Sequence, residues 1–106
     1  FCFWRGMYYE CHITFEAHPK ISEKDVEEHS EAVTGWRFSK IDGDPVLGKG
    51  TRFYLTRNFP VKHGKRNTHI MLDLAANQLG CLPGYGVLRT KIEAVIYDSK
   101  KEIHFD

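Results

Sequence analysis

The chain has 106 residues, of which 42% are hydrophobic and 27% are charged, and its formal net charge is +1. These values fit a single domain with one core, and they exclude a strong global field that would draw the protein onto nucleic acid or an anionic membrane. No stretch approaches the roughly 20 apolar residues that span a bilayer, and none has the pattern of a signal peptide. We therefore expect a soluble cytoplasmic protein.

The first residues and the cysteines indicate which part of the chain forms the domain and whether it contains disulfides. Residues 1–6 precede Met7, and their aromatic density matches no amphipathic pattern. We expect them to be a vector-derived remnant or a disordered start, and residues 7–106 to form the domain. The chain has three cysteines, Cys2, Cys11 and Cys81, and no CxxC pair. This favours reduced thiols over disulfides or a structural zinc site.

Residues 8–16 alternate between apolar and polar side chains, which is the period of a half-buried strand. One face would carry Tyr9, Cys11, Ile13 and Phe15, and the other Glu10, His12, Thr14 and Glu16. A helix is predicted over residues 22–34, with Ser22 as its N-cap and Gly35 as its left-handed C-cap. Its acidic residues are interpreted as a solvated face.

Two strands are predicted next, over residues 36–41 and 51–58, separated by a turn-rich loop. The second of them repeats the half-polar pattern, with Arg52, Tyr54 and Thr56 on its polar face. A second helix should start at Asn67 or Thr68 and run to Leu79. Its expected apolar stripe consists of Ile70, Met71, Leu74, Ala75 and Leu79.

The last strand is predicted over residues 87–98, followed by a polar tail. Leu88, Ile92 and Ala94 should lie on its apolar face, opposite Arg89, Lys91 and Glu93. The order strand, helix, strand, strand, helix, strand predicts an α+β fold of the ferredoxin-like βαββαβ type. In this arrangement both helices cover one face of a four-stranded antiparallel sheet, and the last strand lies at the edge beside the first.

The uncovered sheet face would gather the polar side chains into one candidate site. We expect His12 to transfer a proton, with Glu10 or Glu93 orienting it. Arg52, Arg89 and Lys91 would hold an anion, while Thr14 and Tyr54 would donate hydrogen bonds. The alternative is that these charges only pair with one another across a wet sheet.

A second anion site is predicted where the basic loop enters the second helix, because cations meet free backbone amides there. Lys65 and Arg66 are its candidate ligands, and a solvated loop is the alternative. The six histidines contain no closely spaced pair that could bind zinc, and Asp42-Gly43-Asp44 is interpreted as a turn rather than a calcium loop. We therefore expect neither a metal ion nor an organic cofactor.

His12-Ile13-Thr14-Phe15 is similar to one half of the signature of the two-histidine phosphoesterases, whose His-x-Thr/Ser motif occurs twice. The later His69-Ile70-Met71 lacks the hydroxyl residue. The combination of Glu10-x-His12-Ile13-Thr14 with Arg89-x-Lys91-Ile92-Glu93 also resembles a small uncharacterised family of bacterial and phage-type proteins. The first resemblance implies a phosphoesterase-like hydrolase, and the second implies no established activity.

Together these patterns predict binding of a phosphorylated or carboxylated small molecule on the open sheet face, and they leave enzyme status open. The alternative function is a non-catalytic regulatory or assembly module that forms a homodimer through the same face. Single-stranded nucleic acid is an unfavoured partner, because apart from Tyr54 and Trp36 the face has few aromatic side chains for stacking.

Overall fold

The computed structural model describes residues 7–41, 52–96 and 101–105. The elements follow in the order β1 (Met7–Ala17), α2 (Glu23–Thr34), β2 (Arg37–Ile41), β3 (Arg52–Pro60), η1 (Val61–His63), α3 (Lys65–Gly80), β4 (Tyr85–Ile96) and β5 (Lys101–Phe105). The predicted turn at 42–44 and the start at 1–6 lie outside the described residues. Within the described ranges, no helix is long and apolar enough to cross a bilayer.

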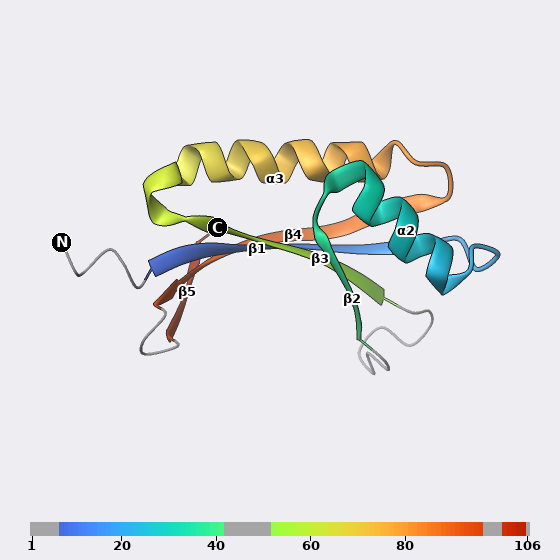
Figure 1. Ribbon diagram of the computed structural model, residues 1–106, viewed down its shortest axis with the longest axis horizontal. Helices are drawn as coiled ribbons and strands as arrows, with labels where there is room; N and C mark the ends of the chain where they lie inside the picture. Colours follow the sequence, from blue (N-terminus) through green and yellow to red (C-terminus); the bar gives the residue numbers. More distant parts are fainter. Residues whose placement is uncertain (1–6, 42–51, 97–100, 106) are drawn as a thin grey trace.

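The five strands form one antiparallel sheet in the order β2-β3-β1-β4-β5. Figure 1 shows α2 and α3 together on one side of this sheet. The predicted ferredoxin-like α+β fold is therefore confirmed, and β1 is central as expected. The predicted edge position of β4 is wrong. A fifth strand, β5, pairs with the outer side of β4 and forms the edge instead.

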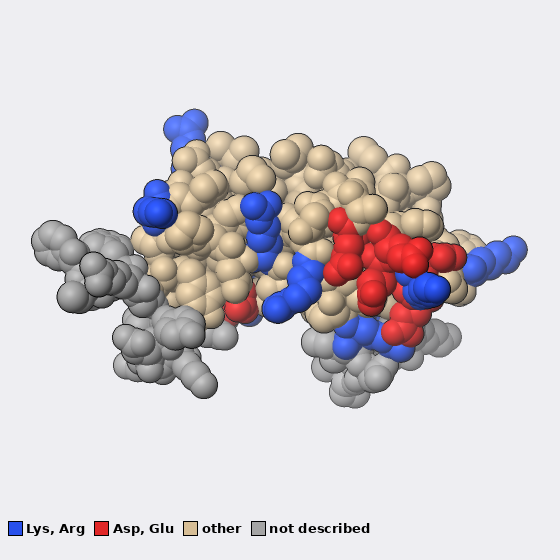
Figure 2. All heavy atoms as spheres, viewed as in Figure 1, with Lys and Arg blue, Asp and Glu red and all other residues tan. Residues whose placement is uncertain are grey.

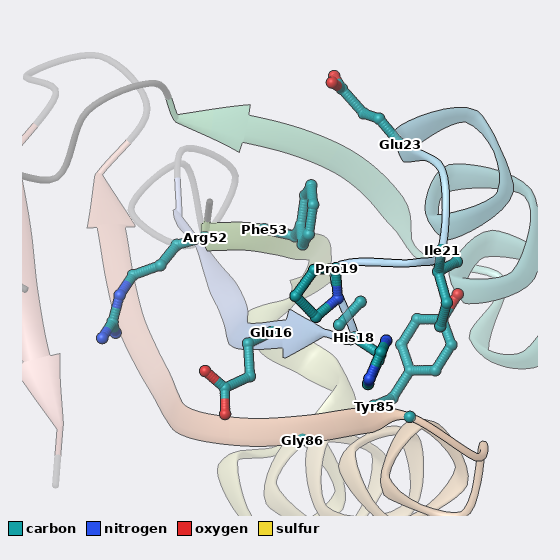
Figure 3. A pocket seen from close by; sticks show the side chains of 11 residues that line it. Glu16, His18, Pro19, Ile21, Glu23, Arg52, Phe53, Tyr85 and Gly86 are labelled. Carbon is teal, nitrogen blue, oxygen red and sulfur yellow. The ribbon is translucent and has the colours of Figure 1, made fainter. Parts of the chain in front are cut away.

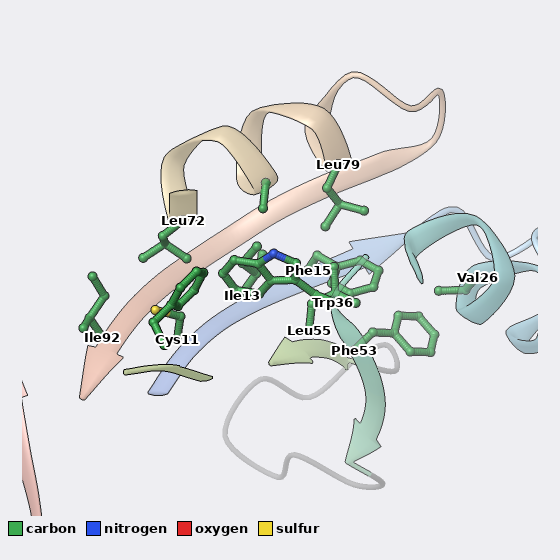
Figure 4. Packing of buried hydrophobic residues seen from close by; sticks show 12 residues of the cluster. Cys11, Ile13, Phe15, Val26, Trp36, Phe53, Leu55, Leu72, Leu79 and Ile92 are labelled. Carbon is green, nitrogen blue, oxygen red and sulfur yellow. The ribbon is translucent and has the colours of Figure 1, made fainter. Parts of the chain in front are cut away.

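The core lies between the sheet and the helices. The alternation in β1 is confirmed, because Cys11, Ile13 and Phe15 have no exposed surface at all. They pack in one cluster with side chains from α2, β3, α3 and β4, and Figure 4 shows Leu72 and Leu79 of α3 pointing at the sheet. The opposite side chains of β1 therefore lie on the face without helices, which we call the open face.

Both ends of α2 follow the predicted pattern. The Ser22 hydroxyl accepts a hydrogen bond from the Asp25 backbone amide at 3.2 Å, and Gly35 caps the helix with a φ of 74°. The acidic side chains of the helix gather over its outer surface in Figure 2. They are all exposed, namely Glu23, Asp25, Glu27, Glu28 and Glu31. This confirms the interpretation as a solvated face.

The second helix begins earlier than predicted, at Lys65 rather than near Asn67 or Thr68. The Thr68 hydroxyl donates to the Gly64 carbonyl at 2.8 Å, so it bonds back within the helix instead of capping it. The predicted apolar stripe is partly wrong, because Ile70 and Leu74 are about half exposed. The buried stripe of α3 is Thr68, Leu72, Ala75 and Leu79.

A bulge changes the face of one residue in β4. The register with β1 shifts between Thr14 and Phe15, so Phe15 pairs with Val87 and Leu88 is left without a partner in the ladder. Leu88 is consequently 42% exposed, which corrects the prediction that it lies on the apolar face. Ile92 and Ala94, beyond the bulge, are buried as predicted.

Trp36, a candidate stacking residue, is also buried, and it packs edge-on against Phe59.

Candidate functional site

The strand register arranges the polar side chains of the open face in rows across the sheet. One row runs through the Cα partners Ser39, Tyr54, Thr14 and Arg89, on β2, β3, β1 and β4. We call it the donor row, because it holds three hydroxyls and a guanidinium and no acid. The next row contains Thr56, His12 and Lys91, and the third contains Asn58, Glu10 and Glu93. Neighbouring rows are about 7 Å apart, since they are two residues apart along each strand.

His12 is held from both sides of its ring. Its Nε2 lies 2.7 Å from Glu10 Oε1, and its Nδ1 lies 3.2 Å from Thr56 Oγ1. The side chains of His12 and Glu10 are 27% and 23% exposed, so both groups are still reached by solvent. A carboxylate can only accept, so Nε2 donates to Glu10; when the ring is neutral, Nδ1 accepts from the Thr56 hydroxyl. Of the two predicted carboxylates, Glu10 is thus the one that contacts His12.

The second carboxylate, Glu93, is buried in the sheet with 4% of its surface exposed. Lys91 lies two residues earlier on β4, and its Nζ forms an ion pair with Glu93 Oε1. Burying a carboxylate is costly unless a cation and hydrogen bonds compensate it. Lys91 therefore neutralises Glu93 along one strand, whereas the alternative predicted from the sequence paired charges across strands.

These rows line a shallow hollow of about 390 Å³ on the open face. Its lining comes from four strands and consists of Glu10, His12, Thr14, Ser39, Tyr54, Thr56, Arg89, Lys91 and Glu93. Seven of these are predicted site residues, so most of the predicted constellation does converge. Ser39 and Thr56 were not assigned a role, although the period of two in their strands places them on the same face.

Three predicted ligands lie elsewhere. Arg52 begins β3, two residues before Tyr54 of the donor row, and lines a different cavity. Lys65 and Arg66 form the first turn of α3, on the helix-covered side of the sheet. They do not line the hollow, so the second predicted anion site is separate from it.

The cavity that contains Arg52 is larger, at about 740 Å³, and the sequence analysis missed it. Figure 3 shows its walls, which come from the end of β1, the loop before α2, the start of β3 and the start of β4. Burial raises the pKa of Tyr85 in this wall, with a smaller contribution from the Asp25 carboxylate. The Tyr85 hydroxyl lies 3.2 Å from His29 Nδ1. No sequence motif links these loops, so only the fold reveals the cavity.

The hollow also contains a set of possible metal donors. One donor atom each from Glu10, His12 and Glu93 lies within 4.8 Å of the others. Two carboxylate oxygens and an imidazole nitrogen suit a divalent transition ion. The prediction that the chain binds no metal ion depended on spacing along the sequence, whereas these three residues meet across two strands.

Comparison of the chain with protein-family models, with curated proteins and with solved structures found no match. The two resemblances noted in the sequence therefore stay predictions. His69 lies within α3, on the side of the sheet opposite to His12, so His69-Ile70-Met71 does not face the first motif.

Proposed function

We propose that the hollow binds an anionic small molecule, either phosphorylated or carboxylated. The donor row carries this proposal, because it sets the guanidinium of Arg89 beside the hydroxyls of Thr14, Tyr54 and Ser39. Arg89 is exposed and has no ion-pair partner among the described residues. A planar guanidinium with hydroxyl donors beside it matches the oxygens of a phosphate or carboxylate.

Two acids of the open face, Glu10 and Glu93, do not cancel this attraction, because each already has a partner. Glu10 contacts His12, and Glu93 is paired with Lys91. The exposed Glu16 lines the neighbouring cavity together with Arg52. Glu10 and Glu93 also lie in the third row, about 14 Å along the strands from the donor row by strand geometry. An anion over the donor row would therefore meet Arg89 first and the paired carboxylates only at the far side of the hollow.

In the catalytic version of the proposal, the reaction is phosphoester hydrolysis, the class that the His12-Ile13-Thr14 resemblance implies. A water would form the new oxygen–phosphorus bond while the bond to the leaving oxygen breaks. Thr56 would take the proton of that water as its own proton passes to His12 Nδ1, and Glu10 would stabilise the resulting imidazolium. The leaving oxygen would take its proton from solvent or Lys91.

A thermal-shift screen tests binding directly, with phosphate, pyrophosphate, mononucleotides, phosphosugars and dicarboxylates as probes, all with EDTA. A ligand that prefers the native state must raise the melting temperature. Arg89→Gln should weaken binding of the responding probe about tenfold. Lys24→Gln on α2 removes the same charge from an exposed position and should leave binding unchanged. An equal loss of binding in both variants would mean that the probe responds to net charge and not to a site at Arg89.

The rival proposal is a module that forms a homodimer through the open face. It is favoured by one observation, since both helices lie on the other side of the sheet. Sedimentation velocity at several concentrations separates the two proposals. A stable dimer whose melting temperature does not change with any probe would contradict anion binding and support the assembly module. We place either function in the cytoplasm, where the free thiols Cys11 and Cys81 would stay reduced.

A further inference from the structure

We propose that the hollow also binds one divalent transition ion, such as Mn²⁺ or Zn²⁺, through Glu10, His12 and Glu93. The inference deepens the proposed function, and rests on it for the role of the ion, because the same hollow would hold both ion and anion. The donor atoms of the three residues already lie within 4.8 Å of one another. Ligands about 2.1 Å from a tetrahedral ion lie about 3.4 Å apart, so side-chain shifts of about 1 Å would complete the site.

The surroundings of His12 give independent support. A histidine that binds a metal through one ring nitrogen usually donates a hydrogen bond from the other, which fixes the ring. Thr56 Oγ1 lies 3.2 Å from Nδ1, so it can accept this bond once Nε2 turns to the ion. Nε2 is the nitrogen that faces Glu10, at 2.7 Å, and thus the carboxylate donors.

The two carboxylates favour a cation at this point. Glu10 and Glu93 are cross-strand Cα partners, and like charges directly opposite each other destabilise a sheet. Glu93 is also the most buried acid among the described residues, with 4% of its surface exposed. A divalent ion between the two would neutralise both, whereas Lys91 forms its ion pair with Glu93 and not with Glu10.

Lys91 is therefore the natural competitor of the ion. Its ammonium is paired with Glu93 Oε1, a donor that the ion needs. When the ion binds, Lys91 would be released toward the middle of the hollow and the donor row. The ion would then strengthen anion binding by freeing an ammonium on the same strand and face as Arg89.

The test is isothermal titration calorimetry of the EDTA-treated, dialysed full chain with MnCl₂ and ZnCl₂ alone, in a buffer without phosphate. We expect one equivalent to bind to the wild-type protein. Glu93→Gln and Glu10→Gln should each weaken binding at least tenfold. Lys91→Gln should strengthen it several-fold, because the competing ammonium is gone. Glu16→Gln, an exposed acid on the same strand outside the metal cluster, is the matched control and should bind as the wild type does.

The inference is overturned if no saturable binding is seen up to 1 mM ion, as a chosen limit on the order of the weakest functional sites. It is also overturned if both Gln variants bind normally or if Lys91→Gln weakens binding. Circular dichroism identifies a Glu93→Gln protein that fails to fold, in which case the partly exposed Glu10 decides the result. Anion binding in EDTA with no ion binding would retain the proposed function alone. Ion binding without any anion response would retain the ion site alone.

Discussion

Lys91 and Glu93 form an ion pair on one strand in which the carboxylate is almost completely buried and the ammonium is about one-third exposed. The pair lies at the acidic end of the hollow, beside Glu10 and His12. Removing the lysine would leave Glu93 without its ammonium partner in a site that water hardly reaches.

We therefore expect Lys91→Met to lower the free energy of unfolding by about 2 kcal/mol at neutral pH, less than for a fully buried pair because the ammonium is partly solvated. Adding Glu93→Gln to Lys91→Met should recover most of this loss. Urea unfolding of the two single variants and the double variant measures the coupling. Strictly additive effects would show that the pair does not stabilise the fold.

The buried stripe of α3 predicts a contrast between two leucines on one helix. Leu72 is 3% exposed and packs on the sheet, whereas Leu74 is 49% exposed. Leu72→Ala should cost about 2–5 kcal/mol, because it leaves a cavity in the core. Leu74→Ala should cost less than about 1 kcal/mol. Chemical denaturation of both variants checks the assignment, and equal costs would argue for the stripe predicted from sequence.

Two glycines should respond to alanine in opposite ways. Gly35 has a φ of 74° with nothing within 4 Å of an added Cβ, so Gly35→Ala tests the left-handed backbone alone. We expect a loss of about 1–2 kcal/mol. Gly80 lies in helical conformation at the end of α3, and Gly80→Ala should be neutral or stabilise by about 0.5 kcal/mol. Thermal unfolding of both variants gives the comparison; destabilisation by Gly80→Ala would contradict it.

Cys11 should make stability depend on alkaline pH. Burial raises the pKa of its thiol from 9.0 to about 12, and the guanidinium of Arg57 only partly opposes this. The unfolded chain loses this proton at lower pH than the folded protein does. The neutral thiol therefore makes its full contribution to the free energy of unfolding below pH 9. This contribution is lost as the pH rises from 9 to about 12.

Over that whole range the loss should reach on the order of 3–4 kcal/mol. Urea unfolding between pH 8 and pH 10.5 should show a steeper decline for the wild type than for Cys11→Ala, which has no thiol to ionise. Other groups titrate equally in both proteins. Parallel pH profiles would mean that the thiol ionises without penalty in the fold.

The order of strands and helices was enough to predict the fold, and the period of two in β1, β3 and β4 was enough to predict most of the hollow. Side chains such as His12 and Lys91 must share a face once their strands are neighbours, because alternation leaves no other choice. The bulge at Leu88 could not be predicted, since it is a shift in the pairing of β4 with β1, between Thr14 and Phe15, that no local sequence pattern marks. The helix stripe was right for Ala75 and Leu79 and wrong for Ile70 and Leu74, which have helical spacing but lie on a face that the sheet does not reach.

The larger cavity and the metal donors were missed for a related reason. Both arise from residues that are distant in the sequence, such as Glu10 and Glu93, and that only the strand order brings together. Motif spacing reports neighbours within one segment, so a site built across strands has no such signature.

The most direct test of the account is an NMR titration of the ¹⁵N-labelled protein with sodium phosphate in EDTA, followed amide by amide. The account predicts that the largest shifts map to the donor row and its neighbours, at Thr14, Tyr54 and Arg89, and that Arg89→Gln needs about tenfold more phosphate to reach the same shifts. Shifts confined to the first turn of α3, around Lys65 and Arg66, or no saturable shifts at all, would contradict an anion site on the open face.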